Sequence, residues 1–362
     1  MAKRKRYKLK RNAKICLFLL CIGMLLIISS AFYISLSSPV DKNDDTEIEV
    51  SIESGMSTVG IANLLKEKGL IKSSKFFLVY NKLNNCKSLK ASNYDLSKSM
   101  SLEDISDVMC TGDYSKNSIN VTFREGLRLT DYADIVEDKT FISSDDFINT
   151  ANDRTYLKEL INKYWFLTDD ILNDNIYYPL EGYLYPDTYN FRSKDVTARE
   201  IIETMLDVED KALSKYKPYL TNGSHTVHEY LTLASMAELE GTNSENRKLI
   251  VGVFENRLAN NINLGSDVTA YYGAGKSMKD ALTSKELNAV NSYNTRNRNM
   301  LGLPVGPICN PGLESIDASI NYTKSDYFYF VADKEKNIYF TKTENEHNAL
   351  INRLKKEGKW LW

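Results

Sequence analysis

The stretch Leu231–Gly241, with the sequence LTLASMAELEG, decides how this chain is interpreted. It closes a predicted helix over residues 227–240 and puts Glu240 at the end of an apolar run. At about 100° of rotation per residue, Glu240 falls on the apolar side of this helix, and Glu238 lies about 200° away from it. The residues that share the side of Glu240 are Tyr230, Leu233, Ala234, Met236 and Ala237. The two glutamates therefore cannot face the same site.

A carboxyl group on an apolar stripe is costly to ionise, so its pKa rises toward neutral pH. A general acid that works near neutral pH needs such a pKa, which makes Glu240 a candidate catalytic acid. The local pattern alone favours a simpler interpretation, in which Glu240 is the last helical residue before Gly241 and caps the helix or lies in solvent. The choice between the two depends on the rest of the chain.

An uncharged, mostly apolar run of 22 residues, 15–36, is long enough for a transmembrane helix. Eight lysines and arginines precede it and no acidic residue does. Because positive charge stays inside, we expect a cytoplasmic N-terminus and an extracytoplasmic domain after the run. A cleaved signal peptide is the alternative. The run continues beyond the weak cleavage pattern Ser29-Ser30-Ala31, which favours an uncleaved, single-pass anchor in the cell membrane.

The net charge of −2 hides an asymmetry between this basic tail and the rest of the chain. Outside the tail, 38 lysines and arginines stand against 48 aspartates and glutamates, a net charge of −10. Such a domain is not suited to hold a phosphate backbone, so nucleic acid is excluded as a partner.

The cysteines and histidines carry no recognisable metal or disulfide pattern. Cys16 and Cys21 lie in the apolar run, and the other three of the five cysteines show no CxxC spacing. This predicts neither a disulfide framework nor a thiolate metal site. His225 and His228 have helical spacing without a third ligand nearby, which disfavours a zinc hydrolase. We expect no metal and no cofactor.

Hydrophobic periodicity predicts an α+β fold in five consecutive parts. They are a basic cytoplasmic tail (1–14), a transmembrane helix (15–36), a linker (37–45), a small α+β module (46–113) and a mixed α+β domain (114–362). In the module we predict strands over 47–52 and 94–96, with helices over 56–68, 73–83 and 101–110. About 65 residues are adequate for independent folding of such a module.

The larger domain opens with a predicted strand over 119–123, followed by helical segments. An aromatic loop, YYPLEGYLYPDTYNF, covers residues 177–191, because Pro179 and Pro186 exclude a regular helix or a central strand there. Further helices are predicted over 198–216, 227–240 and 244–259, then two strands over 327–332 and 338–341, and a closing helix over 344–356.

Five blocks of the larger domain resemble, in order, the signatures of the endolytic murein transglycosylases, the MltG/YceG-like family. The blocks are LEGYLYPDTYNF, ASMAELEG with VFENRL, LGSDVTAYYG, YNT with LGLPVGPICNPG, and YFYFVAD with EHN. The preceding module resembles the family's LysM-like subdomain. The resemblance covers the chain from the membrane run to the C-terminus.

The resemblance implies a membrane-anchored lyase that cuts nascent peptidoglycan strands internally and ends their elongation. The family's catalytic acid is the second glutamate of its A-S-x-x-E-x-E block, which is Glu240 here. A lytic transglycosylase uses the C6 hydroxyl of N-acetylmuramic acid as an intramolecular nucleophile. One glutamic acid can therefore act first as acid and then as base, and the expected product carries a 1,6-anhydro-N-acetylmuramyl end. Cell-wall synthases or division and elongation proteins are possible partners.

The resemblance also implies substrate-binding candidates, namely Asp267, Tyr293, Asn294, Thr295, Glu181 and Tyr185. Asp267 orients the sugar or supports developing charge, or else it forms an Asx turn or helix cap; both roles stay open. Asn294 can bind an N-acetyl group, although a loop asparagine more often bonds its own backbone. In the aromatic loop, packing onto the catalytic helix is the favoured role. The family often reads Q-T-D-P-T at the third block, from which Gly265, Ser266 and Val268 depart.

Two alternatives to the transglycosylase remain. One is a non-catalytic, glycan-binding scaffold that recruits cell-wall synthases. The other is a hydrolase in which Glu240 and Asp267 form the carboxylate pair that ordinary glycosidases need.

Overall fold

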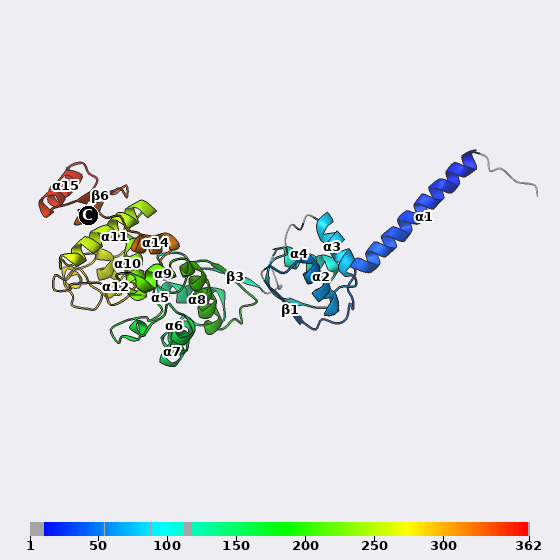
Figure 1. Cartoon of the computed structure of the whole chain (residues 1–362), viewed down its shortest axis with the longest axis horizontal. Helices are drawn as coiled ribbons and strands as arrows, with labels where there is room; N and C mark the ends of the chain where they lie inside the picture. Colours follow the sequence, from blue (N-terminus) through cyan, green and yellow to red (C-terminus); the bar gives the residue numbers. More distant parts are fainter. Residues whose placement is uncertain (1–10, 54, 85, 87–88, 112–117, 361–362) are drawn as a thin grey trace, which may run out of the picture. The chain divides into compact units, whose positions relative to one another are not determined.

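The computed structural model describes residues 11–53, 55–84, 86, 89–111 and 118–360, although the side chains of residues 11–19 and 21 fall outside the description. The chain divides into two compact units, Met1–Ser118 and Ile119–Trp362, and each is described by itself. Among the described residues, strands occur only as three separate antiparallel pairs. The mixed α+β composition agrees with the sequence pattern (Figure 1).

The first unit packs three helices against one strand pair. Its elements are β1 (Ile48–Ile52), α2 (Thr58–Glu67), α3 (Ser74–Leu83), β2 (Ser92–Leu96) and α4 (Leu102–Thr111). Strand β1 pairs with β2 in the register Ile48↔Leu96 to Ile52↔Ser92. Ser57 and Ser73 cap α2 and α3 by accepting backbone N–H bonds, as Ser and Thr commonly do at helix starts. Each predicted element of the module is present within two residues of its expected ends.

A disulfide joins Cys86 to Cys110 in this unit, with the Cα atoms 5.8 Å apart. The prediction that no disulfide is present is therefore wrong. The two cysteines lie 24 residues apart in sequence, a spacing with no recognisable motif, and they meet because Cys110 lies in the last turn of α4 and Cys86 follows α3. Cys309 is a buried free thiol.

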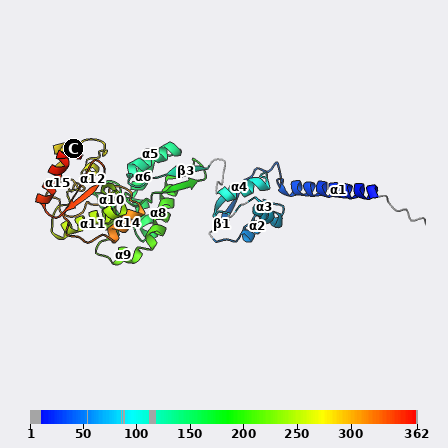
Figure 2. The same ribbon diagram turned by 90° about the horizontal axis from the view of Figure 1, so that it is seen from above.

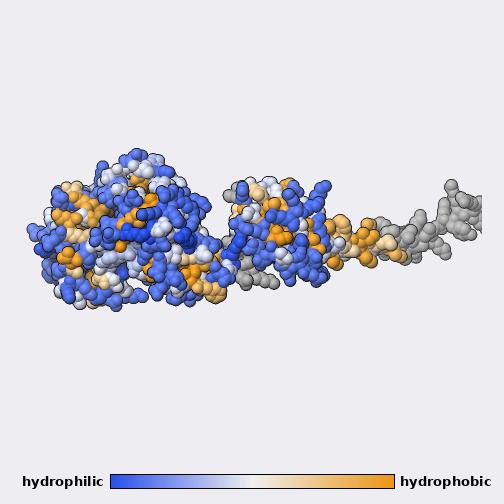
Figure 3. Space-filling model, turned by 90° about the horizontal axis from the view of Figure 1, so that it is seen from below, coloured by the Kyte–Doolittle hydropathy of each residue, from blue (hydrophilic) through white to orange (hydrophobic). Residues whose placement is uncertain are grey.

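Helix α1 spans Arg11–Ser37, yet no helix in the described part of the chain is both long enough and apolar enough to cross a membrane. The prediction of a transmembrane helix over residues 15–36 is corrected accordingly. The described stretch of α1 exposes large apolar side chains (Figure 3), but Ser29, Ser30 and Ser35 interrupt it. The predicted basic tail, 1–14, lies outside the described residues and side chains.

The second unit is mainly helical. Its first half contains β3 (Ile119–Thr122), α5 (Leu129–Lys139), α6 (Ser144–Asn152), α7 (Arg154–Lys163), the 3-10 turn η1 (Asp169–Leu172), β4 (Thr188–Phe191) and α8 (Ala198–Ser214). Its second half contains α9 (Lys217–Asn222), α10 (Val227–Glu240), α11 (Ser244–Ala259), α12 (Asp267–Gly273), α13 (Ser284–Leu287), α14 (Leu313–Ile320), β5 (Tyr329–Ala332), β6 (Ile338–Thr341) and α15 (Glu344–Lys356). Strand β3 pairs with β4, and β5 with β6.

Helix α10 lies at the centre of the second unit. It packs against α11, α12 and α14, and both ribbon views draw α10, α11 and α14 side by side (Figures 1 and 2). Every residue from Tyr230 to Ala237 is buried, so the helix is covered on all sides rather than along one stripe. Leu231 and Ala234 belong to the apolar core around α5–α8, whereas Leu233 and Met236 belong to a second core with α11 and α12.

An irregular segment, residues 305–312, runs along α10 and is tied to it at three levels. The carbonyl of Val305 lies 2.8 Å from His228 Nε2, and the N–H of Ile308 donates to Ser235 Oγ over 3.1 Å. The N–H of Gly312 donates to Glu238 Oε2 over 3.1 Å. The segment therefore fixes the position of α10 along most of its length.

Candidate active site

Glu240 is the last residue of α10, and its side chain is half-buried. The Ser266 hydroxyl donates a hydrogen bond of 2.6 Å to Glu240 Oε1. Although solvent reaches part of the residue, protein atoms surround the carboxyl group closely, and this burial raises the pKa of Glu240 to about 7. The Ser266 hydrogen bond opposes the rise, Asp267 adds to it, and Arg296 opposes it. A carboxyl group with this pKa is protonated in a large fraction of molecules at neutral pH.

Two threonines fix the position of Ser266. The backbone N–H of Ser266 donates to Thr295 Oγ1 over 3.1 Å, and its carbonyl accepts from Thr269 Oγ1 over 2.7 Å. The two threonine hydroxyls lie 2.8 Å apart. All three residues are buried. The loop that carries the Glu240 partner is therefore clamped by hydrogen bonds that leave its backbone little freedom.

Asp267 is the first residue of α12 and lies next to this arrangement. Its carboxylate pairs with the Arg296 guanidinium at 3.0 Å, and both side chains are roughly half exposed. The Arg296 guanidinium also donates to the Gly265 carbonyl over 3.2 Å. The pair brings one negative and one positive charge close to Glu240, so their opposing effects on its pKa partly cancel.

Glu238 is bonded on the other side of the helix. Arg247 donates to Glu238 Oε1 over 2.8 Å, while Ser315 Oγ and the N–H of Gly312 donate to Oε2 over 2.6 and 3.1 Å. None of these groups bonds Glu240. The sequence prediction that the two glutamates face different sites is confirmed.

Glu181 lies in the buried interior rather than at this site. Its carboxylate accepts from the Leu129 N–H over 2.9 Å, from the Tyr272 hydroxyl over 3.0 Å and from the Asn310 amide over 3.2 Å. Burial raises the pKa of Glu181 to about 8, against the effect of these donors. Its contacts join the aromatic loop to α5 and α12, a packing role.

The block Tyr293-Asn294-Thr295 is buried throughout. The Tyr293 ring contacts the rings of Tyr177 and Tyr272, each with centroids 4.7 Å away. The Asn294 amide donates to three backbone carbonyls of the loop around α13. Of the three, Thr295 alone touches the loop that holds Glu240, through Ser266. Tyr185 is half-buried, and its carbonyl accepts from the Tyr189 hydroxyl.

The structure thus gathers Glu240, Asp267 and Thr295, and it does not bring Glu181, Asn294 or Tyr185 to them. Sequence reasoning overlooked two neighbours of Glu240, Ser266 and Arg296. Ser266 lies in the LGSDVTAYYG block, where the sequence marks it only as a departure from the family pattern. Arg296 directly follows the Y-N-T block. The serine directly before Asp267 offers a weak sequence signal for Ser266, and no signal marks Arg296.

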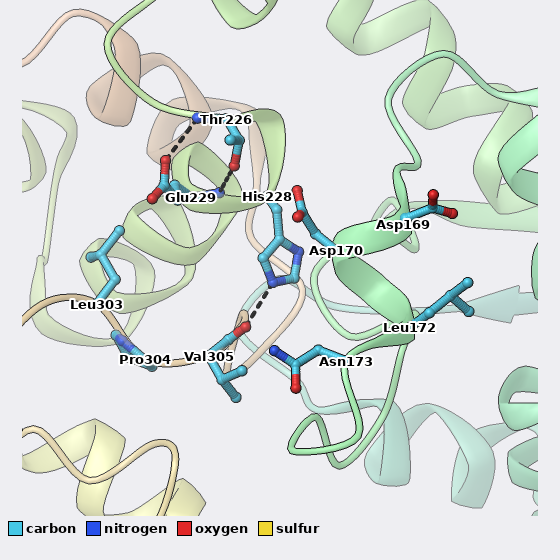
Figure 4. A pocket seen from close by; sticks show the side chains of 10 residues that line it. All are labelled: Asp169, Asp170, Leu172, Asn173, Thr226, His228, Glu229, Leu303, Pro304 and Val305. Atoms are coloured by element: carbon cyan, nitrogen blue, oxygen red, sulfur yellow. Dashed lines mark hydrogen bonds between the residues drawn. The ribbon is translucent and has the colours of Figure 1, made fainter.

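A cavity of about 550 Å³ lies at the other end of α10 (Figure 4). Its lining residues are Asp169, Asp170, Leu172, Asn173, Thr226, His228, Glu229, Leu303, Pro304 and Val305. His228 is held between the Tyr183 hydroxyl at 2.7 Å and the Val305 carbonyl at 2.8 Å, and burial lowers its pKa. This cavity does not include Glu240. We place the candidate active site at Glu240, because this carboxyl group has a pKa of about 7 and one oxygen anchored by Ser266.

Within the described ranges, no group of three or more His, Cys, Asp or Glu side chains is arranged to hold a metal ion. The site therefore offers one carboxyl group that exchanges a proton near neutral pH, with one of its oxygens anchored. Such a group can donate a proton to a leaving oxygen and later accept one.

A family model described as the YceG-like family matches residues 50–353. An endolytic murein transglycosylase of Bacillus subtilis (strain 168) is 37% identical over 326 residues, which cover 89% of both chains. An endolytic murein transglycosylase of Streptococcus pneumoniae is 33% identical over 329 residues, 86% of this chain and 59% of that relative. The crystal structure of a yceG-like protein from Listeria monocytogenes is similar with a TM-score of 0.61 and 38% identity, over 84% of this chain and 99% of that one.

Proposed function

The chain belongs to the YceG-like family, and from that premise we propose that it is an endolytic murein transglycosylase. Its relatives of that name resemble it over most of its length. It is then a lyase that acts on peptidoglycan and cuts glycan strands internally. The enzyme is favoured over a non-catalytic scaffold because the relatives that match over most of this chain are named as transglycosylases.

The observation that carries the proposal is the Glu240 carboxyl, anchored at Oε1 by Ser266 and given a pKa of about 7 by burial. In the proposed reaction, protonated Glu240 gives its proton to the oxygen between N-acetylmuramic acid and N-acetylglucosamine as that bond breaks. The resulting carboxylate then takes the proton of the muramyl C6 hydroxyl as this oxygen bonds to C1. The product is a 1,6-anhydro-N-acetylmuramyl end, and the cut ends elongation of the strand.

Asp267 is less suited to act as a second catalytic carboxylate. Its carboxylate forms an ion pair with Arg296 at 3.0 Å, so its charge is already balanced within the protein. A one-acid mechanism, with the substrate's own hydroxyl as nucleophile, needs no second carboxylate.

We place the second unit outside the cytoplasm, where peptidoglycan lies. The Cys86–Cys110 disulfide supports this proposal, because disulfides persist mainly in oxidising compartments. The first unit, with its β1–β2 pair and three helices, is proposed to be the LysM-like module that contacts glycan. Cell-wall synthases are the proposed protein partners, since an enzyme that ends elongation acts where strands are made.

The test uses the full chain and purified, uncrosslinked glycan strands, with mass spectrometry of the released ends. We expect anhydro-muramyl ends from the parent protein and none above background from Glu240→Gln. Unchanged anhydro ends from the Glu240→Gln variant would support the scaffold, with a contaminating activity. Reducing ends from the parent protein would instead indicate the hydrolase and overturn the one-acid mechanism.

A further inference from the structure

We propose that Ser266 is a positioning residue for the reaction, which anchors Glu240 Oε1 so that Oε2 carries the transferred proton. The inference rests on the proposed function, since it assigns a role within that reaction. It is built on the hydrogen bonds around the carboxyl group and not on the resemblance to the family, whose pattern differs at this position.

Ser266 occupies the N-cap of α12, but its hydroxyl makes no capping hydrogen bond. A serine in this position ordinarily accepts a bond from the N–H of the second or third helical residue. Every other N-cap Ser or Thr in the described chain does so, as Thr226 does at the start of α10. The Ser266 hydroxyl is directed to Glu240 instead, at the expense of the bond that would stabilise its own helix.

Buried hydrogen bonds hold the backbone of Ser266 in place. Thr295 and Thr269 bond its N–H and its carbonyl, respectively, and Ser266 is 3% exposed. The Gly265 N–H donates to the Thr295 carbonyl over 3.0 Å, which ties the preceding residue to the same threonine. These bonds hold the Ser266 backbone beside Glu240, within reach of the 2.6 Å hydrogen bond from the hydroxyl to Oε1.

The Ser266 hydroxyl can donate to Oε1 in both protonation states of Glu240. When the proton sits on Oε2, Oε1 is the carbonyl oxygen of the acid and still accepts. When Oε2 has given its proton to the glycosidic oxygen, the same bond stabilises the carboxylate more strongly, as bonds to charged groups do. The anchor at Oε1 thus persists through the acid step and the following base step, which leaves proton transfer to Oε2.

The charged groups that face Glu240 are Asp267 of α12 and Arg296, which follows the Y-N-T block. Neither of them bonds Oε1. Loss of the Ser266 bond therefore changes the stability of the Glu240 carboxylate while leaving both charges in place, and this effect is visible in a pH profile.

The experiment compares kcat, KM and the pH dependence of kcat/KM for the full chain and for Ser266→Ala, Ser266→Thr and Ser315→Ala. Ser315 is the matched control, because its hydroxyl donates to Glu238 Oε2 over the same 2.6 Å and is equally buried. We expect Ser266→Ala to lower kcat by about 10- to 100-fold, less than the about 10²- to 10³-fold of a lost oxyanion-hole donor because this bond is made to the catalytic acid rather than to the substrate, with little change in KM. The loss of a donor to the carboxylate moves the descending alkaline limb to higher pH.

Ser266→Thr keeps a hydroxyl, so we expect it to restore most of kcat and the parent position of the alkaline limb. Ser315→Ala is expected to leave the limb where it is. A Ser266→Ala variant with the parental kcat and the parental alkaline limb of kcat/KM overturns the proposal. A loss of kcat with an unmoved alkaline limb and a lowered melting temperature overturns it too, because it indicates a structural role. If Ser266→Ala gives either of these two results while Glu240→Gln is inactive, the proposed function is retained and only the role of Ser266 is rejected.

Discussion

Glu238 and Glu240 are two residues apart on the same helix, and their surroundings differ in the number of groups that donate to them. Glu238 receives bonds from Arg247, Ser315 and a backbone N–H, including an ion pair in which the side chains are 7% and 12% exposed. Glu240 receives a single bond, from Ser266. Glu238, whose carboxylate accepts three hydrogen bonds, stabilises the fold. Glu240, with one hydrogen bond and a raised pKa, can still exchange a proton.

The largest effect that separates the two glutamates is expected in activity. Glu240→Gln removes the transferable proton, so we expect release of glycan ends to fall by about 10²- to 10⁴-fold. Glu238→Gln leaves Glu240 and Ser266 in place and is expected to keep activity within about tenfold at a temperature where it is folded. Initial rates on uncrosslinked strands measure both. Equal losses of activity in the two variants would contradict the assignment of different roles to Glu238 and Glu240.

The second effect concerns the free energy of unfolding, which Glu238→Gln is expected to lower. Glu238→Gln removes the charge that pairs with the largely buried Arg247 guanidinium, whose other ion-pair partner, Glu314, is exposed. Loss of one charge from a buried ion pair is strongly destabilising. We expect a loss of about 3 kcal/mol in the free energy of unfolding, measured by denaturant titration at pH 7. A change below about 0.5 kcal/mol would show that Glu238 is dispensable for the fold.

The third effect is a pH-dependent gain in stability for Glu240→Gln. The pKa of Glu240 is about 7 in the folded chain and 4.5 in the reference state, so the folded chain binds the proton more tightly. Its contribution to stability is present at low pH and is lost as the pH rises through 7. We expect the Gln variant to exceed the parent by on the order of 2–3 kcal/mol at pH 8, and by little at pH 4. Thermal melts across this range measure the difference, and a pH-independent gap would contradict the raised pKa.

The smallest effect concerns the charge beside Glu240. Asp267→Asn removes a negative charge that raises the pKa of Glu240 and releases Arg296, which lowers it. The alkaline limb of kcat/KM should therefore move to lower pH, by less than about one pH unit, because both side chains are half exposed and screened by solvent. Added salt is expected to shrink the shift. A shift to higher pH would show that Asp267 does not act on Glu240 through its charge.

The longer helices of the second unit are predictable because short local patterns mark their ends, whereas the shorter α12, α13 and α14 are not predicted from the sequence. Residues 227–240 were predicted as a helix, and the structure has α10 over Val227–Glu240. Thr226 and Glu229 form a capping box at its start, and Gly241 follows its last residue. Strand β4 was not predicted, because the prolines of the aromatic loop obscured four extended residues that pair with β3.

The long-range partners of Glu240 were not predictable from pattern. Ser266 lies 26 residues after Glu240 in sequence, and a serine before a helix predicts a cap rather than a bond to another helix. The helical wheel gave the correct separation of Glu238 and Glu240, but α10 is buried on all sides, so no apolar stripe marks the active side. The Cys86–Cys110 pairing depended likewise on tertiary proximity.

The clamp of Thr269 and Thr295 on Ser266 has a consequence for the stage of folding at which the protein becomes active. The residues that surround the Glu240 carboxyl group come from three places in the chain, the end of α10, the start of α12 and the segment around Thr295. Before these meet, Glu240 is an ordinary carboxylate of an unfolded polypeptide, fully ionised at neutral pH. The raised pKa of Glu240 therefore exists only in the completed fold, and an unfolded or partly folded molecule lacks the protonated carboxyl group that cleavage needs.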